Sequence, residues 1–388
     1  MPTRNAFRRR RMKYEQRTTN NELRSMKYEK ISIIGDGGMA TVLAMLLCEK
    51  QKPLKTGDER RGTRDEPRTT RPVVKMWGYD NRQLAEIKKH RENKKFLPGY
   101  KLPKDLIFEP DDARIMEGAD LIVSAVPCQF MRSVWTRLKS YVPRDIPIVS
   151  VAKGIENGTL FRPTQILADI LDEGRGTTDE RRATRYAVLS GPTIADELAR
   201  KLPATACAAS TDESLAGDIQ RIFSEGVPWL RVYTNTDVVG VELAGAMKNI
   251  IAIAAGIIDG IKLGDNAKAA LLTRGLAEIT RLGVAMGAKP QTFAGLAGLG
   301  DLVTTCISPK GRNRSFGERV GKGRPVRQAQ AATESVIEGI ATCKSVVALA
   351  ARYNVEMPIT QAVYEVLFEN KPVRTAVAGL MGRRLKAE

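Results

Sequence analysis

One stretch of the sequence constrains the fold more than any other. Residues 241–258 are almost all small or branched apolar residues. A segment that is apolar on every side packs as a helix inside a protein, and its Ala and Gly residues allow neighbouring backbones to approach closely. The uninterrupted apolar run Ile250–Ile258 is far shorter than the roughly 20 residues of a membrane span. We therefore expect a core helix and no integral membrane segment.

Lys248 lies in the middle of this apolar stretch, beside Asn249. One interpretation is that the lysine extends its ammonium group to water along an apolar stem. The other is that burial lowers its pKa towards neutrality, as in lysines that act as an acid and a base. The flanking residues carry almost no charge, which favours the second interpretation and makes Lys248 a candidate proton donor.

The histidine content narrows the chemistry further. The chain has one histidine, His90, within the polar run EIKKHRENKK, where we expect it on the surface. A Ser-His-Asp triad would have to use this single histidine, so a surface position of His90 argues against such a triad. One histidine also cannot form a multi-histidine metal site. Proton transfer is therefore expected from Lys, Asp, Glu or Tyr, and no metal is expected.

Basic residues exceed acidic ones and give the chain a net charge of +18. Such a surplus favours anionic partners, which include nucleic acid, lipid surfaces and phosphorylated metabolites. Much of it lies in residues 1–28, 51–71 and 174–185, which lack apolar periodicity. We interpret the first as a disordered basic extension and the other two as polar surface insertions. Aromatic residues make up only 5% of the chain, too few for stacking on bases, so we expect no nucleic acid.

The cysteines indicate the compartment. The chain has five, scattered and without a CxxC pair, a pattern that argues for a reducing environment and against a disulfide frame or zinc site. No apolar segment typical of a secretory signal is visible near the start. We therefore expect a cytoplasmic protein, and 388 residues accommodate two domains.

The first predicted strand, Lys30–Ile34, leads into the sequence GDGGMA (residues 35–40) and then into an apolar helical stretch. This strand, G-x-G-x-x-A and helix order is typical of a dinucleotide-binding turn. Gly35 permits the tight turn, Gly37 lets the backbone approach a pyrophosphate, and Ala40 allows close packing of the helix on the strand. The helix N-terminus then faces the phosphates.

The second predicted strand, residues 73–78, ends beside Tyr79 and Asp80. In dinucleotide-binding folds an acidic residue at this point accepts a hydrogen bond from the adenosine ribose. We therefore expect Asp80 at the ribose. Insertion 51–71 separates the glycine turn from this strand.

Strands and helical stretches continue to alternate, which predicts a parallel, doubly wound sheet of the Rossmann type. Its later strands are expected at 120–126, 146–152 and 186–190. In such sheets ligands bind at the carboxyl ends of the strands. Lys153 follows one of these strands, and Gly191 and Thr193 follow the next, so all three are candidate ligand contacts.

The strand pattern stops near Thr236, which predicts a Rossmann-type domain over 29–235 and an all-α domain over 236–388. The most informative loop of the second domain is residues 295–317. Asp301 lies there among glycines and apolar residues, a poor place for an unpaired carboxylate. Arg312 and Asn313 offer a guanidinium and an amide that suit a phosphate.

Together these motifs resemble the NAD(P)-dependent glycerol-3-phosphate dehydrogenases of bacterial type, over about residues 30–385. The similarity is greatest in SGPTIADELA (190–199), GVELAGAMKNIIAIAAGIIDG (240–260), NAKAALLTRGLAE (266–278), GLAGLGDLVTTC (295–306) and RNRSFG (312–317). The resemblance implies reversible reduction of dihydroxyacetone phosphate to sn-glycerol 3-phosphate with NAD(P)H. It also implies a homodimer that supplies glycerophospholipid synthesis.

The resemblance assigns roles by position. It implies catalytic roles for Lys248, Lys153, Asp301 and Asn249. It implies substrate contacts from Lys153, Gly191, Thr193, Lys248, Asp301, Arg312 and Asn313. It implies cofactor contacts from Gly35, Gly37, Gly38, Met39, Ala40, Tyr79, Lys153, Ala195, Arg312 and Glu338.

Two questions stay open. The first is the choice between NADH and NADPH, because the chain has no clear arginine for a 2′-phosphate beyond Arg82. The chain also departs from the family at Met39, Ala40, Tyr79 and Cys128. The second is whether the chain is a related two-domain dehydrogenase acting on another hydroxyacid or a sugar acid. The combination of Lys248, Asp301 and the Arg312-Asn313 pair argues against it.

Overall fold

The computed structural model describes residues 28–49, 72–172 and 185–385. Within these ranges the first half of the chain forms an eight-stranded sheet. In spatial order its strands are β3 (Ile107–Phe108), β2 (Val73–Trp77), β1 (Lys30–Ile34), β4 (Leu121–Ser124), β5 (Ile148–Ser150), β6 (Tyr186–Ser190), β7 (Ala204–Ala209) and β8 (Leu230–Asn235). The pairs from β3 to β6 are parallel, which confirms the predicted class of fold.

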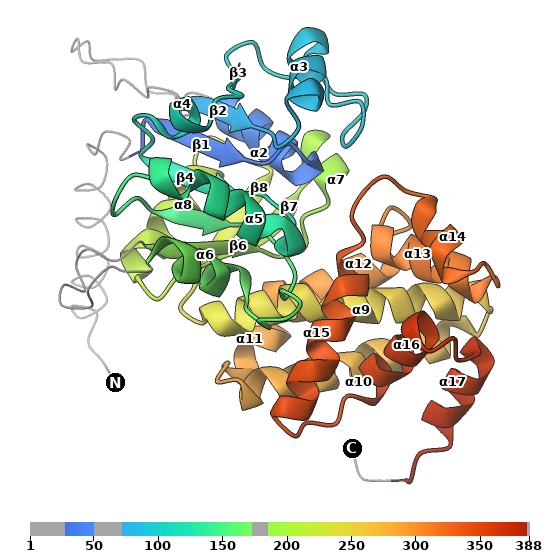
Figure 1. Cartoon of the computed structure of the whole chain (residues 1–388). Helices are drawn as coiled ribbons and strands as arrows, with labels where there is room; N and C mark the ends of the chain where they lie inside the picture. The colour runs from blue at the N-terminus through green and yellow to red at the C-terminus, as the bar shows by residue number, and fades with distance from the viewer. Residues whose placement is uncertain (1–27, 50–71, 173–184, 386–388) are drawn as a thin grey trace, which may run out of the picture.

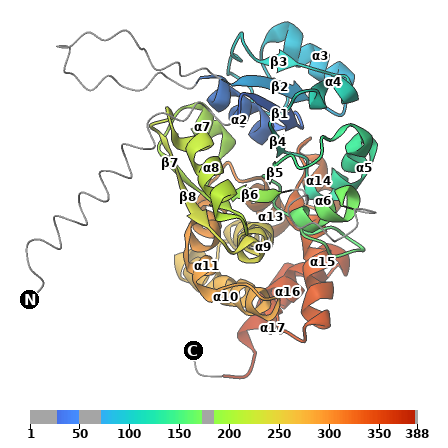
Figure 2. The same ribbon diagram turned by 90° about the vertical axis from the view of Figure 1, so that its left-hand side faces the viewer.

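Helices cover both faces of this sheet (Figure 2). One face carries α2 (Gly38–Cys48), α3 (Asn81–His90), α7 (Ala195–Ala199) and α8 (Glu213–Ser224). The other carries α4 (Asp112–Met116), α5 (Cys128–Leu138) with the short turn η1 (Lys139–Tyr141), and α6 (Pro163–Leu171). The strands are buried on both faces because they lie between these two helical layers, as expected of a doubly wound sheet.

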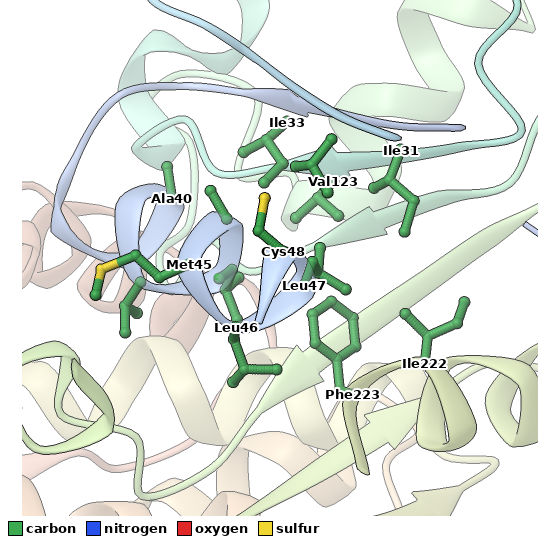
Figure 3. Close-up of a cluster of buried hydrophobic side chains, with 14 of the residues drawn as sticks. Ile31, Ile33, Ala40, Met45, Leu46, Leu47, Cys48, Val123, Ile222 and Phe223 are labelled. Carbon is green, nitrogen blue, oxygen red and sulfur yellow. The ribbon is translucent and has the colours of Figure 1, made fainter. Parts of the chain in front are cut away.

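Helix α2 anchors the glycine turn to the core. Figure 3 shows its Leu46 and Leu47 among Ile31 of β1 and Phe223 of α8. Burial of each such side chain contributes about 1.5–3 kcal/mol. The first turn of α2 is therefore held firmly at the carboxyl end of β1.

Between Val238 and Met381 the described residues form helices and no strands, as predicted for the region after Thr236. The helices are α9 (Val238–Gly260), α10 (Gly264–Ala285), α11 (Pro290–Ala294), the π-helical turn η3 (Leu296–Gly300), α12 (Asp301–Ile307), α13 (Arg312–Gly321), α14 (Val326–Ala331), α15 (Glu338–Arg352), α16 (Pro358–Phe368) and α17 (Val373–Met381). Figure 1 shows α9 running from beneath the sheet into the middle of this helical region.

Helix α9 is the predicted core helix. Its small residues admit α13 at very short range: a Cβ added to Gly256 would lie 1.9 Å from the carbonyl oxygen of Arg314. A Cβ added to Gly317 of α13 would lie 2.0 Å from the carbonyl oxygen of Ile253. Any larger side chain at these positions would push the two helices apart, which confirms the close approach predicted from composition.

By length and composition alone, α9 is also the one helix of the described residues that would suit a membrane span. Of its most apolar window, however, 94% is buried inside the protein. The helices packed around it take the place that lipid would have. Its apolar character therefore reflects its position in the core of the helical region.

Three strands escaped prediction, β3, β7 and β8, and the last two change the sheet. Strand β7 is antiparallel to β6, and β8 runs parallel to β7. The sheet is therefore mostly, and not wholly, parallel. The segment Ala204–Ala209 (ATACAA) is rich in alanine, which is depleted in strands, so its extended form depends on pairing with β6 and β8.

The predicted limits of the polar segments were wrong at two residues. Tyr28, placed in the disordered extension, is buried and donates its hydroxyl hydrogen to Asp218 at 3.0 Å. Arg185, placed in the second insertion, forms an ion pair with Asp212. The remainder of the predicted extension and insertions lies outside the described residues. His90 ends α3, where its side chain is half-buried.

Candidate active site

A cavity of about 820 Å³ opens between the carboxyl ends of the strands and the helical region. On the sheet side it is lined by the turns that follow β1, β2, β4, β5 and β6. On the other side it is lined by residues of α9, α12, α13 and α15. The predicted site residues that line it are Gly35, Gly37, Gly38, Met39, Tyr79, Lys153, Thr193, Ala195, Lys248, Asn249, Asp301, Arg312, Asn313 and Glu338. Ala40 and Gly191 do not line it.

The glycine turn has the geometry of a cradle for a dinucleotide. Gly35 has a φ of +124°, and a Cβ there would lie 2.7 Å from the carbonyl oxygen of Ala125. A Cβ at Gly37 would meet nothing within 4 Å, so the backbone at the N-terminus of α2 is open to a ligand. Ala40 is fully buried beneath the turn, where it serves packing as predicted, and its cofactor contact stays a prediction.

Asn93, which the sequence did not single out, fixes this turn. Its side-chain amide donates to the carbonyl oxygen of Asp36 at 2.7 Å and to Oγ1 of Thr41 at 2.8 Å. It is fully buried, so both bonds are shielded from water. The backbone around Asp36 is therefore set before any ligand binds.

The end of β2 differs from expectation. Asp80 does not line the cavity, and its side chain caps α3 by accepting from the backbone N–H of Arg82 at 2.9 Å. Asp80 therefore does not stand at the ribose position as predicted. Tyr79 is 65% exposed at the cavity and packs edge-to-face on Trp77, with ring centroids 6.4 Å apart.

Three charged groups meet on the floor of the cavity. Lys248 of α9 is 6% exposed and Asp301, the first residue of α12, is 2% exposed. Lys248 Nζ lies 2.7 Å from Asp301 Oδ1, and Lys153 Nζ lies 2.7 Å from Asp301 Oδ2. One carboxylate therefore bridges two ammonium groups from opposite sides of the cavity, and the cluster keeps a net positive charge.

Neighbouring oxygens orient both lysines. Lys153 also donates to the carbonyl oxygen of Gly191 at 2.9 Å, and Lys248 donates to the hydroxyl of Thr305. Gly191 thus holds Lys153 in place and does not itself line the cavity, and its substrate contact stays a prediction. Thr305 lies four residues after Asp301 on the same helix, a spacing that would have pointed to it.

Burial lowers the pKa of Lys248 to about 8. The Asp301 carboxylate opposes this change, whereas the positive charge of Lys153 adds to it. A lysine with this pKa exchanges a proton near neutral pH, as the apolar surroundings in the sequence predicted.

A chain of amides crosses the cavity floor. Asn249 donates to the carbonyl oxygen of Lys153 at 3.2 Å, and its own Oδ1 accepts from Asn313 at 3.0 Å. Asn313 Oδ1 in turn accepts from the backbone N–H of Gly339 at 3.0 Å. These bonds tie the strand side of the cavity to α9, α13 and α15.

Two further charged groups face the cavity from helix N-termini. Arg312 begins α13 and its side chain is exposed to the cavity, whereas Glu338 begins α15. Oε1 of Glu338 accepts from the backbone N–H of Cys128 at 3.3 Å, but Oε2 is buried with no hydrogen-bond partner. Burial raises the pKa of this carboxyl to about 7. The unpartnered oxygen is an open acceptor for a polar group of a ligand.

Other residues that line the cavity were not singled out by the sequence. They are chiefly Asp36, Trp77, Phe96, Pro98, Phe130, Thr304, Thr305, Lys310 and Glu334. Four of these nine residues are apolar, and their positions at the cavity depend on how the chain folds back. Asp36 lies inside the glycine turn, but its role depends on which residues the fold places against its side chain.

The fold and the cavity together define a dehydrogenase of the nicotinamide-dinucleotide class, with a lysine in the place of an acid/base group. Comparison with known proteins goes further. Residues 30–216 match the model of the NAD-dependent glycerol-3-phosphate dehydrogenase N-terminus, and residues 237–378 match that of the C-terminus. The chain belongs to this family.

Individual relatives cover nearly the whole chain. It is 44% identical to glycerol-3-phosphate dehydrogenase (NAD(P)+) of Geobacter sp. strain M21, over 93% of this chain and 99% of the relative. It is 45% identical to the protein of that description from Corynebacterium glutamicum strain R, over 92% and 99%. The crystal structure of glycerol-3-phosphate dehydrogenase from Coxiella burnetii is similar, with 35% identity, a TM-score of 0.81, and coverage of 92% and 100%.

Proposed function

We propose that this chain catalyses the reversible reduction of dihydroxyacetone phosphate to sn-glycerol 3-phosphate with a reduced nicotinamide dinucleotide. The observation that carries the proposal is the Lys248–Asp301–Lys153 cluster on the floor of a cavity that also contains a glycine turn. Family membership supplies the substrate, because relatives over the full length are named for glycerol 3-phosphate.

The residues facing the cavity suit both ligands. We assign dinucleotide binding to residues 29–235, through Gly35, Gly37 and the N-terminus of α2, where the dipole favours a pyrophosphate. The open space at Gly37 and the unpartnered Oε2 of Glu338 support this fit. When bound, the reduced nicotinamide supplies the hydride. We assign substrate binding and the proton donor mainly to residues 236–388.

Lys248 is the proposed acid and base. As negative charge develops on the C2 oxygen of the ketone, protonated Lys248 donates a proton to that oxygen. In the reverse direction neutral Lys248 removes it from the C2 hydroxyl. Asp301 holds the ammonium group in place, and Lys153 and Asn249 stabilise and orient the oxyanion.

The substrate phosphate is assigned to the N-terminus of α13. Arg312 offers a guanidinium fork, and the helix dipole adds partial positive charge at the same place. Asn313 uses one amide hydrogen and its oxygen within the amide chain, which leaves its second amide hydrogen for the phosphate. Thr193 lies across the cavity as a further hydroxyl partner.

The test is absorbance loss at the reduced-nicotinamide band when dihydroxyacetone phosphate is added to the full chain with NADH or NADPH. We expect rapid oxidation, and much slower oxidation with dihydroxyacetone, which lacks the phosphate. No oxidation by a folded protein that binds the dinucleotide would overturn the substrate and move the proposal to another hydroxyacid.

We further propose that the protein acts in the cytoplasm as a homodimer and supplies glycerol 3-phosphate for phospholipid synthesis. All five cysteines are buried, and Cys128, Cys207, Cys306 and Cys343 are free, which supports a reducing compartment. Sedimentation analysis of the full chain tests the dimer, and a monomer active at assay concentration would overturn it.

A further inference from the structure

The acidic side chain at the adenosine end of the cavity comes from the glycine turn and not from the end of β2. Asp36 lines the cavity between Gly35 and Gly37. Its carboxylate lies against Gly78, the residue after β2: a Cβ added to Gly78 would be 2.8 Å from Asp36 Oδ2 and 3.0 Å from Cγ. The carboxylate therefore occupies the point where dinucleotide-binding folds place an acidic residue for the ribose 2′-hydroxyl.

The backbone that carries this carboxylate is fixed. Asn93 holds the carbonyl oxygen of Asp36 at 2.7 Å, and Gly35 on one side of it has a backbone conformation that other residues rarely adopt. The carboxylate packs into space left by the absence of a side chain at Gly78, since any side chain there would collide with it. The turn thus presents a negative charge at one defined place.

Two cations, one beside Tyr79 and one whose charge acts on Asp36, are already engaged. The guanidinium of Arg137 stacks over Trp77 and Tyr79 and bonds Asp112 through two nitrogens, at 2.6 and 2.8 Å. Lys95, whose charge acts on Asp36, forms an ion pair with Glu334 at 3.6 Å. Arg82 is exposed and does not line the cavity. Asp80 adds a second negative charge that raises the pKa of Asp36, although burial is the larger cause.

We infer that Asp36 makes this chain selective for NADH over NADPH. The carboxylate accepts a hydrogen bond from a ribose 2′-hydroxyl, and it repels a 2′-phosphate. Arg137 and Lys95 do not compensate the charge of that phosphate, because each is paired with another carboxylate. The inference rests on the proposed function only in requiring that the cavity bind a nicotinamide dinucleotide. It adds the choice of cofactor, which family membership leaves open.

The test is fluorescence titration of the full chain with NADH and with NADPH, in the absence of substrate. We expect NADPH to bind more weakly than NADH by about tenfold or more, the size of a close like-charge penalty. Asp36→Asn removes the charge and keeps the shape, so the gap between the two dissociation constants should contract by roughly tenfold, mainly through tighter NADPH binding.

Asp80→Asn is the matched control, because asparagine caps a helix as well as aspartate does and the same charge is removed nearby. It should change the ratio of dissociation constants by less than about threefold, as expected for an exposed charge. Asp36→Ser serves in the same way as Asp36→Asn if the asparagine variant does not fold.

The outcomes separate this inference from the proposed function. Wild-type binding of NADPH as tight as that of NADH would overturn the inference, and so would an unchanged ratio in the folded Asp36 variant. An equal effect of Asp80→Asn would also overturn it. Selective NADH binding without reduction of dihydroxyacetone phosphate would uphold the inference and overturn the proposed substrate.

Discussion

The two sides of the cavity are built by different means. On the sheet side the key features are backbone features: the positive φ of Gly35, the open space at Gly37 and the N-terminus of α2. On the helical side they are charged side chains buried among apolar ones, with Lys248 and Asp301 at its centre.

The difference reflects what each side has to do. A dinucleotide is held along its length by close approach of the backbone, so shape decides and small side chains are required. Proton transfer needs a group whose pKa lies near the working pH, and burial beside opposite and like charges provides it. Substitutions in the glycine turn should therefore change binding or folding, whereas those at Lys248 and Asp301 should change turnover.

The largest expected effect is that of Lys248→Ala. Removal of the proton donor should lower kcat by about 10²- to 10⁴-fold, the usual contribution of a positioned acid or base. NADH binding, measured by fluorescence titration, should change little, because the turn that binds it is untouched. Lys322→Ala is the control: it removes an exposed lysine at the C-terminal end of α13 and should keep wild-type turnover. Wild-type turnover in the Lys248 variant would show that the proton comes from another group.

A pair of glycine variants sharpens the same comparison from the sheet side. Gly35→Ala should lower the free energy of unfolding by about 1–3 kcal/mol, because alanine is strained at its φ and meets the Ala125 carbonyl. Gly37→Ala should leave stability nearly unchanged, because its Cβ enters open space. It should instead weaken NADH binding by about 1–3 kcal/mol, roughly 5- to 150-fold in Kd, since that space is needed by the ligand.

Urea unfolding without ligand and NADH titration measure the two effects separately. Equal losses of stability in both variants would contradict the assignment of the space at Gly37 to a ligand. Unchanged NADH binding by Gly37→Ala would contradict it as well.

The smallest expected effect is at an ion pair that links the two sides across the cavity. Lys310, in the loop between α12 and α13, forms an ion pair with Asp196 of α7, and both side chains are partly exposed. Such pairs contribute about 0.2–1 kcal/mol. Lys310→Gln should therefore raise the Kd for NADH by no more than about fivefold, in a way that weakens with added salt. A much larger loss would mean that Lys310 touches the dinucleotide itself.

The sequence was most informative where chemistry and local pattern coincide. The GDGGMA turn between an apolar strand and helix located the sheet side of the cavity, and a lysine inside an apolar run located Lys248. What it missed depends on contacts between distant segments. The extended form of the alanine-rich β7 requires its neighbours, and the carboxylate of Asp36 gains its meaning only from Gly78 opposite.

Three residues expected at the site do not line the cavity, for a related reason. Ala40 and Gly191 match their motifs, yet one packs under the turn and the other holds Lys153 through its carbonyl oxygen. Asp80 follows the second strand, where a ribose contact is expected, but its side chain caps α3. Sequence position indicated which residues are near the cavity, but not which atoms face it.

The most direct test of the account is the pH dependence of kcat/KM in both directions of the reaction. Reduction needs protonated Lys248, so its kcat/KM should fall as the pH rises through about 8, the pKa of this lysine. Oxidation of glycerol 3-phosphate needs the neutral amine, so its kcat/KM should rise through the same range. Because the Asp301 carboxylate raises the pKa of Lys248, Asp301→Asn should move both inflections to lower pH. Profiles with the same sign in both directions, or inflections that Asp301→Asn leaves in place, would contradict the assignment of Lys248 as the acid and base.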